Sequence, residues 1–139
     1  MVWTFFGHRD SSDVIQGKLS KAILDLIAGG ARTFLVGNNG SFDYLVQEAL
    51  SNISNTRNIK VSIVLSQINE RAISGYQDLT VFPQELAGVP KRFAISKRND
   101  YMLKRADFVI AYVENSISCS AKWLKKAEKA KKKIINLAK

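Results

Sequence analysis

The sequence contains one cysteine, Cys119, and one histidine, His8. A single cysteine excludes a framework of intrachain disulfide bonds, and these two residues cannot by themselves form a cluster with the ligand spacing of a zinc site. No stretch approaches the roughly 18 consecutive apolar residues that a membrane-spanning helix needs, and the N-terminal stretch MVWTFFGHRD contains neither a basic leader nor a small-residue cleavage site. We therefore expect a cytoplasmic protein that does not contact the membrane and has no structural metal or redox centre.

Acidic residues are few: 12 Asp and Glu against 21 Lys and Arg leave a net charge of +9. The segment from Lys122 to Lys139 carries eight lysines and one acidic residue, Glu128, whereas the rest of the chain is nearly balanced. The lysines of residues 120–133 alternate with Ala121, Leu124 and Ala127 or Glu128 at about helical spacing, so we interpret that stretch as a helix with a solvated basic face. Binding of nucleic acid by this helix is the lesser alternative.

Short apolar runs alternate with amphipathic stretches along the chain. With 139 residues, of which 46% are hydrophobic, the chain fits one compact domain, which we place at residues 1–139. The predicted strands cover residues 2–6, 33–37, 60–66, 79–82, 108–113 and 133–138. The predicted helices run from candidate caps at residues 11–13 to Gly29, and over residues 42–53, 97–107 and 119–132, with irregular structure at 67–78 and 83–96. This alternation favours parallel pairing and therefore the α/β class, a single-domain, doubly wound, Rossmann-like and mostly parallel sheet flanked by helices.

Three polar turns follow predicted strands, at Gly7–Asp10, Gly37–Ser41 and Glu114–Ser120. Ligands of open parallel sheets bind outside the carboxyl ends of the strands. We therefore expect these three turns to face one another.

The turn at Gly37–Ser41 has the composition of an anion-binding turn. Gly37 and Gly40 allow backbone conformations and close approaches that other residues resist, and Ser41 is expected to cap the helix that follows. The unpaired N–H groups at that helix start would attract a phosphate. A carboxylate at Asp43 would repel a phosphate beside it, so Asp43 either accepts hydrogen bonds from ribose hydroxyls or only favours the helix N-terminus.

Four stretches carry a family resemblance: FFGHRD, VGNNGSFDYLVQEAL, KRNDYMLKRADFVIAYVENS and AKWLKKAEKAKKKIINL. They resemble the SLOG superfamily of Rossmann-like nucleotide-binding domains and, within it, the small bacterial YpsA-like branch. The match in order and spacing runs from about Thr4 to Leu137. This resemblance implies a self-associating protein, a dimer or tetramer, that binds nucleotides or nucleotide-derived ligands at the carboxyl ends of its strands.

The resemblance also implies which residues bind the ligand. By position, Gly7, His8 and Arg9 match the family's first binding turn, and Arg98 with Asn99 matches its Arg-Asn pair. The guanidinium of an arginine at a helix start suits a phosphate, since it can donate two parallel hydrogen bonds. The glycine turn of the family corresponds here to Gly37, Gly40 and Asp43.

The chain departs from the family where relatives have a Gly-Gly pair before the penultimate helix. Ser118, Cys119 and Ser120 stand there instead, and Ser118 or Ser120 is expected to cap the helix and offer a hydroxyl to a phosphate. The signature of the phosphoribohydrolases in the superfamily, Pro-Gly-Gly-x-Gly-Thr-x-x-Glu, is absent. This absence counts against that enzyme activity.

Several residues have two interpretations each. Arg9 either binds the ligand or pairs with a nearby aspartate, and a nucleophilic pair of Cys119 with His8 is a minor alternative because no third residue orients it. The aromatic residues Phe42, Tyr44 and Trp123 either stack on a base or pack in the core or a subunit interface.

Three functions remain open at this stage. The first is binding of a nucleotide or nucleotide-derived ligand, such as an ADP-ribose or a cyclic nucleotide, by a sensor or sequestering sponge without turnover and without a cofactor. The second is an enzyme that hydrolyses the N-glycosidic bond of a nucleotide with the help of Glu114, and the third is a single-stranded DNA-binding protein. The candidate ligand-binding residues are Gly7, His8, Arg9, Gly37, Asn38, Asn39, Gly40, Ser41, Asp43, Arg98, Asn99, Glu114, Ser118 and Ser120.

Overall fold

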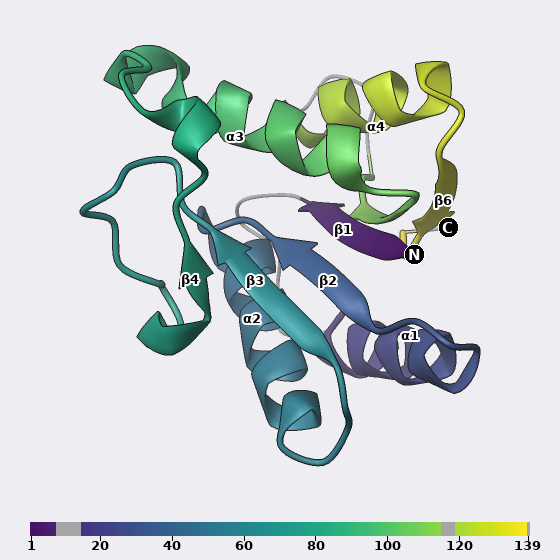
Figure 1. Cartoon of the computed structure of the whole chain (residues 1–139). Coiled ribbons are helices and arrows are strands. Elements are labelled where there is room, and N and C mark those ends of the chain that lie inside the picture. Colours follow the sequence, from purple (N-terminus) through teal and green to yellow (C-terminus); the bar gives the residue numbers. More distant parts are fainter. Residues whose placement is uncertain (8–14, 115–118, 139) are drawn as a thin grey trace.

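The structure, a computed structural model, describes residues 1–7, 15–114 and 119–138 (Figure 1). Its strands are β1 (Val2–Gly7), β2 (Thr33–Val36), β3 (Lys60–Val64), β4 (Thr80–Val81), β5 (Phe108–Tyr112) and β6 (Lys133–Asn136). Its α-helices are α1 (Gln16–Ala28), α2 (Ser41–Ser54), α3 (Lys91–Arg105) and α4 (Cys119–Lys129), and two short 3-10 helices are η2 (Gln77–Leu79) and η3 (Gln84–Leu86).

The six strands form one sheet in the order β4-β3-β2-β1-β5-β6, and every pair in it is parallel. The chain moves outward from β1 through β2 and β3 to β4, and then crosses back to β5 on the other side of β1. The predicted doubly wound α/β fold is therefore confirmed. The direction of winding reverses between β1 and β5, so the crevice beyond the end of β1 is the topological switch point of the sheet.

Helices cover both faces of the sheet, with α1 and α2 on one face and α3 and α4 on the other (Figure 1). Because successive side chains of a strand point to opposite faces, neighbouring residues of β1 enter different cores. Phe5 packs in the core under α1 and α2, whereas Phe6 packs with Met102 of α3 and Trp123 of α4. Burial on both faces explains why these strands read as continuous apolar runs.

Helix α3 begins at Lys91, although residues 83–96 were predicted to be irregular and the helix was predicted to start at residue 97. Pro90 precedes the helix in an extended conformation, and the buried stripe of the helix is narrow. Its first two turns bury only Ala94. They therefore carry no apolar periodicity by which a sequence pattern could have revealed them.

Helix α4 is shorter than predicted, because it ends at Lys129 rather than near residue 132. Lys131 adopts a left-handed conformation with φ of 59°, and the N–H of Lys132 donates to the carbonyl oxygen of Ala127. This backbone geometry closes the helix end. The candidate caps at residues 11–13 lie outside the described residues, and α1 begins at Gln16.

Among the described residues, no helix combines the length and the apolar character that crossing a bilayer requires.

The absence of a side chain at Gly7 lets the start of α2 pack against the end of β1. A Cβ atom at Gly7 would lie 2.3 Å from Cγ of Phe42, whose ring is 1% exposed. We predict that Gly7→Ala lowers the free energy of unfolding by about 1–3 kcal/mol, because the buried ring must move. Urea unfolding followed by circular dichroism measures this change.

The matched control is Gly17→Ala in α1, where no described atom lies within 4 Å of the added Cβ. Alanine there should keep or raise stability by up to about 1 kcal/mol, since it is the better helix former. Equal stabilities of the Gly7 variant and the parent protein would contradict the packing argument.

Candidate functional site

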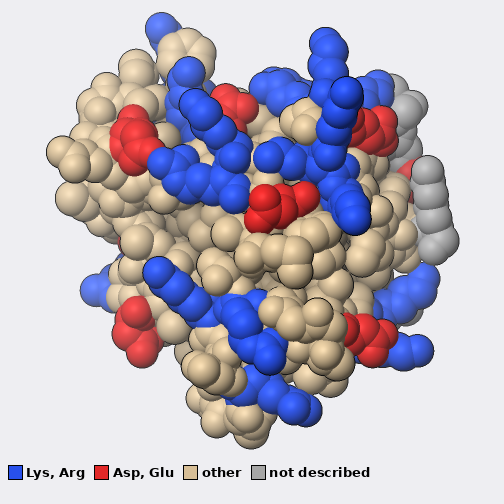
Figure 2. All heavy atoms as spheres, turned by 45° about the vertical axis from the view of Figure 1, so that its right-hand side comes forward, with Lys and Arg blue, Asp and Glu red and all other residues tan. Residues whose placement is uncertain are grey.

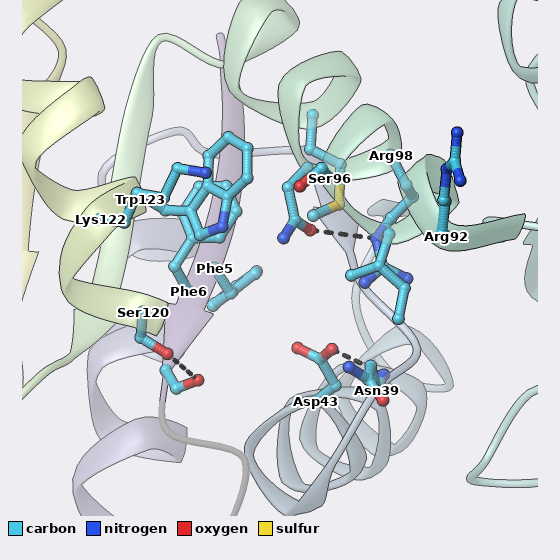
Figure 3. Close-up of a pocket in the computed structure, with 14 residues that line it drawn as sticks. Phe5, Phe6, Asn39, Asp43, Arg92, Ser96, Arg98, Ser120, Lys122 and Trp123 are labelled. Carbon is cyan, nitrogen blue, oxygen red and sulfur yellow. Dashed lines mark hydrogen bonds between the residues drawn. The ribbon is translucent and has the colours of Figure 1, made fainter. Parts of the chain in front are cut away.

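A pocket with a volume of about 490 Å³ lies at the topological switch point (Figure 3). Its walls are the end of β1, the turn before α2, the first turn of α4 and one long face of α3. The lining residues are Phe5, Phe6, Gly7, Asn39, Asp43, Arg92, Ile95, Ser96, Arg98, Asn99, Met102, Ser120, Lys122 and Trp123.

The structure brings six of the predicted site residues together in this pocket. They are Gly7, Asn39, Asp43, Arg98, Asn99 and Ser120. These residues are far apart in the sequence. They come from four regions, namely the three polar turns with the helix starts beside them and the Arg-Asn pair. His8, Arg9 and Ser118, which were also predicted here, lie outside the described residues.

Ser120 connects the two sides of the switch point. Its hydroxyl donates a hydrogen bond to the carbonyl oxygen of Gly7 at the end of β1. The side chain thereby ties the start of α4 to the neighbouring strand end, so Ser120 acts in positioning that helix as well as in lining the pocket.

The glycine turn has a different geometry from the predicted one, because Gly40 and not Ser41 occupies the cap position of α2. Gly40 has a φ of 97°, which L side chains rarely adopt, and Ser41 is the first residue of the helix. The N–H of Asn39 donates to Oδ2 of Asp43 over 2.8 Å. An amide of this turn is thus bound by the protein's own carboxylate.

Gly37 makes room for two charged side chains. A Cβ atom at this position would lie 2.7 Å from Oδ2 of Asp43 and 3.4 Å from Cζ of Arg98. The glycine therefore lets the carboxylate and the guanidinium approach the turn from α2 and α3, although Gly37 itself does not line the pocket.

Asn38 serves the scaffold and not the pocket. Its amide nitrogen donates to Oε1 of Glu70 and to the carbonyl oxygen of Arg71, both over 2.8 Å, and its amide oxygen accepts from the N–H of Ile73 over 2.8 Å. Gln47 also donates to Asn38, over 3.0 Å. These bonds hold the segment after β3 against the glycine turn.

Gln47 was missed by the sequence analysis. It is fully buried, and its amide nitrogen donates to the carbonyl oxygen of Gly37 over 2.8 Å, while Ser74 donates to its amide oxygen. The only signal in the sequence was an amide on α2 one turn after Asp43. A buried amide of this kind is stable only with every polar atom paired, which the structure achieves.

Arg98 is 2% exposed and is held among polar groups at the ends of the strands. Its Nε donates to Oδ1 of Asn99 over 3.1 Å, and Nη1 lies 3.4 Å from the carbonyl oxygen of Val64. Burial lowers the pKa of Arg98, whereas the negative charges of Asp43 and Glu70 raise it. The guanidinium stays charged at neutral pH, because an arginine pKa starts so high.

Asp43 is the carboxylate of this pocket, and it points into it (Figure 3). Burial raises its pKa from 3.8 to about 6, and the charge of Arg98 and the N–H of Asn39 offset part of that increase. The side chain therefore changes charge near neutral pH.

Arg92, Ser96 and Lys122 also line the pocket and were not among the predicted site residues. Arg92, Ser96 and Asn99 recur every three or four residues, which puts them on one face of α3. This spacing could have been read from the sequence had the helix been predicted from Lys91 onward. The prediction placed the helix start six residues too late.

Of the aromatic candidates, Trp123 contacts the pocket from within the core. Its ring is stacked on Phe6 with a centroid distance of 5.9 Å and is 5% exposed. Phe42 is buried against Gly7, and Tyr44 is 42% exposed on α2. Neither of these two is among the residues that line the pocket.

Glu114 lies beside a second hollow, which is lined by Ile15, Lys18, Tyr112, Val113, Leu137 and Ala138 as well as Glu114. The hydroxyl of Tyr112 donates to its carboxylate. The structure thus does not bring Glu114 into the pocket that contains Arg98. Among the described residues, no group of three His, Cys, Asp or Glu side chains is arranged to hold a metal ion.

In comparisons with known proteins, no family model matches the chain and no curated protein matches it. The pocket must therefore be interpreted from its own chemistry. Among the described residues that line the pocket, that chemistry is three basic side chains and one carboxylate at the switch point of a doubly wound sheet.

The raised pKa of Asp43 predicts a specific pH dependence of stability. The native state keeps its proton up to about pH 6, whereas the unfolded chain loses it near 3.8. The free energy of unfolding should therefore fall as the pH rises from 4 to 6 and then level off. Asp43 should contribute up to about 3 kcal/mol to this decrease. Asp43→Asn, which retains an acceptor for the Asn39 N–H, should lack this decline in urea unfolding measured between pH 4 and pH 8.

Asp25→Asn, at an exposed position of α1, is the matched control and should keep the pH profile of the parent protein. Identical profiles for the Asp43 variant and the parent would show that Asp43 is not protonated in this pH range.

Proposed function

We propose that this protein is a cytoplasmic nucleotide-binding protein whose pocket holds a nucleotide or a nucleotide-derived ligand, such as an ADP-ribose or a cyclic nucleotide, without turnover. It would act as a sensor or as a sequestering sponge. The observation that carries this proposal is that two exposed basic side chains, Arg92 and Lys122, line a pocket at the switch point of the sheet. This is the place where doubly wound folds bind their ligands.

The size and charge of the pocket fit such a ligand. Its volume of about 490 Å³ lies within the range of small-molecule sites. Among the described residues that line the pocket, Arg92 and Lys122 add two positive charges to the Arg98–Asp43 pair, and this excess favours an anion. An Asp43 carboxylate that points into the pocket is also an acceptor for the hydroxyl groups of a ribose.

Side chains, rather than the amides of the glycine turn, would contact the phosphate groups. Asp43 binds the N–H of Asn39, and Gly37, Asn38, Gly40 and Ser41 are not among the residues that line the pocket. The sequence-based expectation of a cradle made of turn amides is therefore replaced by one in which Arg92 and Lys122 grip the anion. The proposal remains in agreement with the resemblance to the SLOG superfamily.

Binding without turnover has more support than N-glycosidic hydrolysis. Asp43 is the one carboxylate among the described residues that line the pocket, and Glu114 lies at the other hollow. Most glycoside hydrolases use a pair of carboxylates at the scissile bond. The described part of the pocket offers no such pair.

Self-association belongs to the same proposal. Phe93 on α3 and Val81 on β4 are each more than two-fifths exposed, and neither lines the pocket. Contact with a second copy of the chain would bury these apolar side chains.

Binding of single-stranded DNA is the second candidate, and a surface feature favours it. Helices α3 and α4 together carry ten basic and two acidic residues. Figure 2 shows Lys and Arg side chains gathered over the upper part of the molecule, where these helices lie. A surface of this kind attracts the phosphate backbone of a nucleic acid.

A thermal-shift panel of nucleotides tests the proposal. We expect a nucleotide to raise the melting temperature, and Arg92→Ala or Lys122→Ala to weaken its binding roughly tenfold each, because each removes a charged hydrogen-bond donor. Both residues are exposed, so their replacement should leave the fold intact. Arg98 is unsuitable for this test because it is buried.

Lys97→Ala on α3 and Lys129→Ala on α4 are the matched controls, since both lysines are exposed and neither lines the pocket. Both variants should bind the nucleotide with the affinity of the parent protein. Chromatography of the ligand after incubation distinguishes binding from cleavage. Intact ligand is expected, whereas cleavage products would show that the protein is an enzyme. No response to any nucleotide, together with salt-dependent binding of an oligonucleotide, would favour the DNA-binding alternative.

A further inference from the structure

The two exposed cations among the described residues of the pocket come from different helices. Arg92 lies in the first turn of α3 and Lys122 in the first turn of α4. In Figure 3 these residues are on opposite sides of the pocket, with Asp43 between them on the floor. We therefore expect a phosphate group that contacts Arg92 to be a different group from one that contacts Lys122.

The pocket is also elongated along α3. Its lining on that helix runs from Arg92 to Met102, which corresponds to about 15 Å along the helix axis. A ligand that fills this length extends well past one phosphate-binding position.

The middle of the pocket disfavours a phosphate. The Asp43 carboxylate points into it, and the Arg98 guanidinium is bonded to Asn99 and lies near the carbonyl oxygen of Val64. Arg98 and Asp43 also offset each other's charge. This central region suits a neutral group with hydroxyl donors, such as a ribose.

Apolar side chains complete the middle of the pocket. Ile95 and Met102 of α3 line it from one side and Phe6 of β1 from another. These side chains offer van der Waals contact to a base, so the pocket combines an apolar and hydroxyl-binding centre with a cation on either side.

We infer that this pocket selects nucleotides that carry phosphate groups on two different positions of the ribose, one phosphate bound by Arg92 and the other by Lys122. The ligand class is the nucleoside bisphosphates, with the remaining ribose hydroxyl donating to Asp43. This inference rests on the proposed function and adds the arrangement of the phosphates to it.

Isothermal titration calorimetry with defined ligands tests the inference. The probes are the four ribonucleoside 3′,5′-bisphosphates and their 3′- and 5′-monophosphates. We expect at least one bisphosphate to bind roughly tenfold more tightly than either of its monophosphates, since each phosphate adds a charged hydrogen bond.

The two variants should then separate the phosphates. Arg92→Ala should remove the preference for the bisphosphate over one of the monophosphates, and Lys122→Ala should remove the preference over the other. Lys97→Ala and Lys129→Ala should retain both preferences. The 2′-deoxy bisphosphate should bind several-fold more weakly than its ribose counterpart, and this difference should disappear in Asp43→Ala.

The outcomes distinguish this inference from the proposed function. Monophosphates that bind as tightly as the bisphosphates, or two variants that remove the same preference, would overturn the inference and leave nucleotide binding in place. No binding of any of these compounds would overturn the inference, and the proposed function falls as well only if the wider nucleotide panel is also without effect.

Discussion

The close approach of α2 to the ends of β1 and β2 is the constraint on which the pocket depends. Two glycines permit it, because Gly7 leaves room for the ring of Phe42 and Gly37 leaves room for the Asp43 carboxylate. A side chain at Gly7 would meet the buried ring of Phe42, and a side chain at Gly37 would displace the Asp43 carboxylate. The carboxylate would then no longer lie under the pocket, and the guanidinium of Arg98 would lose the negative charge that offsets its own.

This packing has an electrostatic consequence. Burial of a charged group costs free energy, and nearby opposite charges offset only part of that cost. Asp43 responds with a raised pKa, and Arg98 is surrounded by the carbonyl oxygen of Val64, the amide of Asn99 and the charges of two carboxylates. The exposed cations Arg92 and Lys122 carry no comparable burial. Contact with an anionic ligand would therefore lower the electrostatic free energy of these two side chains the most. The proposed binding relies on them for this reason.

The sequence predicted the fold well and the site in part. Alternating apolar runs and amphipathic stretches were enough for the parallel sheet, because strands buried on both faces have a simple apolar signature. The early start of α3 was missed, since a polar helix with one narrow buried stripe lacks that signature, and Arg92 and Ser96 were missed with it. Gly40 adopts a positive φ, a conformation that its residue type had indicated, but it and not Ser41 caps α2.

The amino-acid sequence by itself determined the class of the fold, the polar turns at the strand ends and the excess of positive charge, because these follow from local periodicity, glycine positions and composition. Only the tertiary structure decided which residues of these turns line the pocket. It placed Asn38 in a buried network with Gln47, set Glu114 apart from Arg98, and brought Arg92 and Lys122 to opposite sides of one pocket. These relations depend on how helices far apart in the sequence pack on the sheet, and packing of that kind leaves no trace in the spacing of residues along the chain.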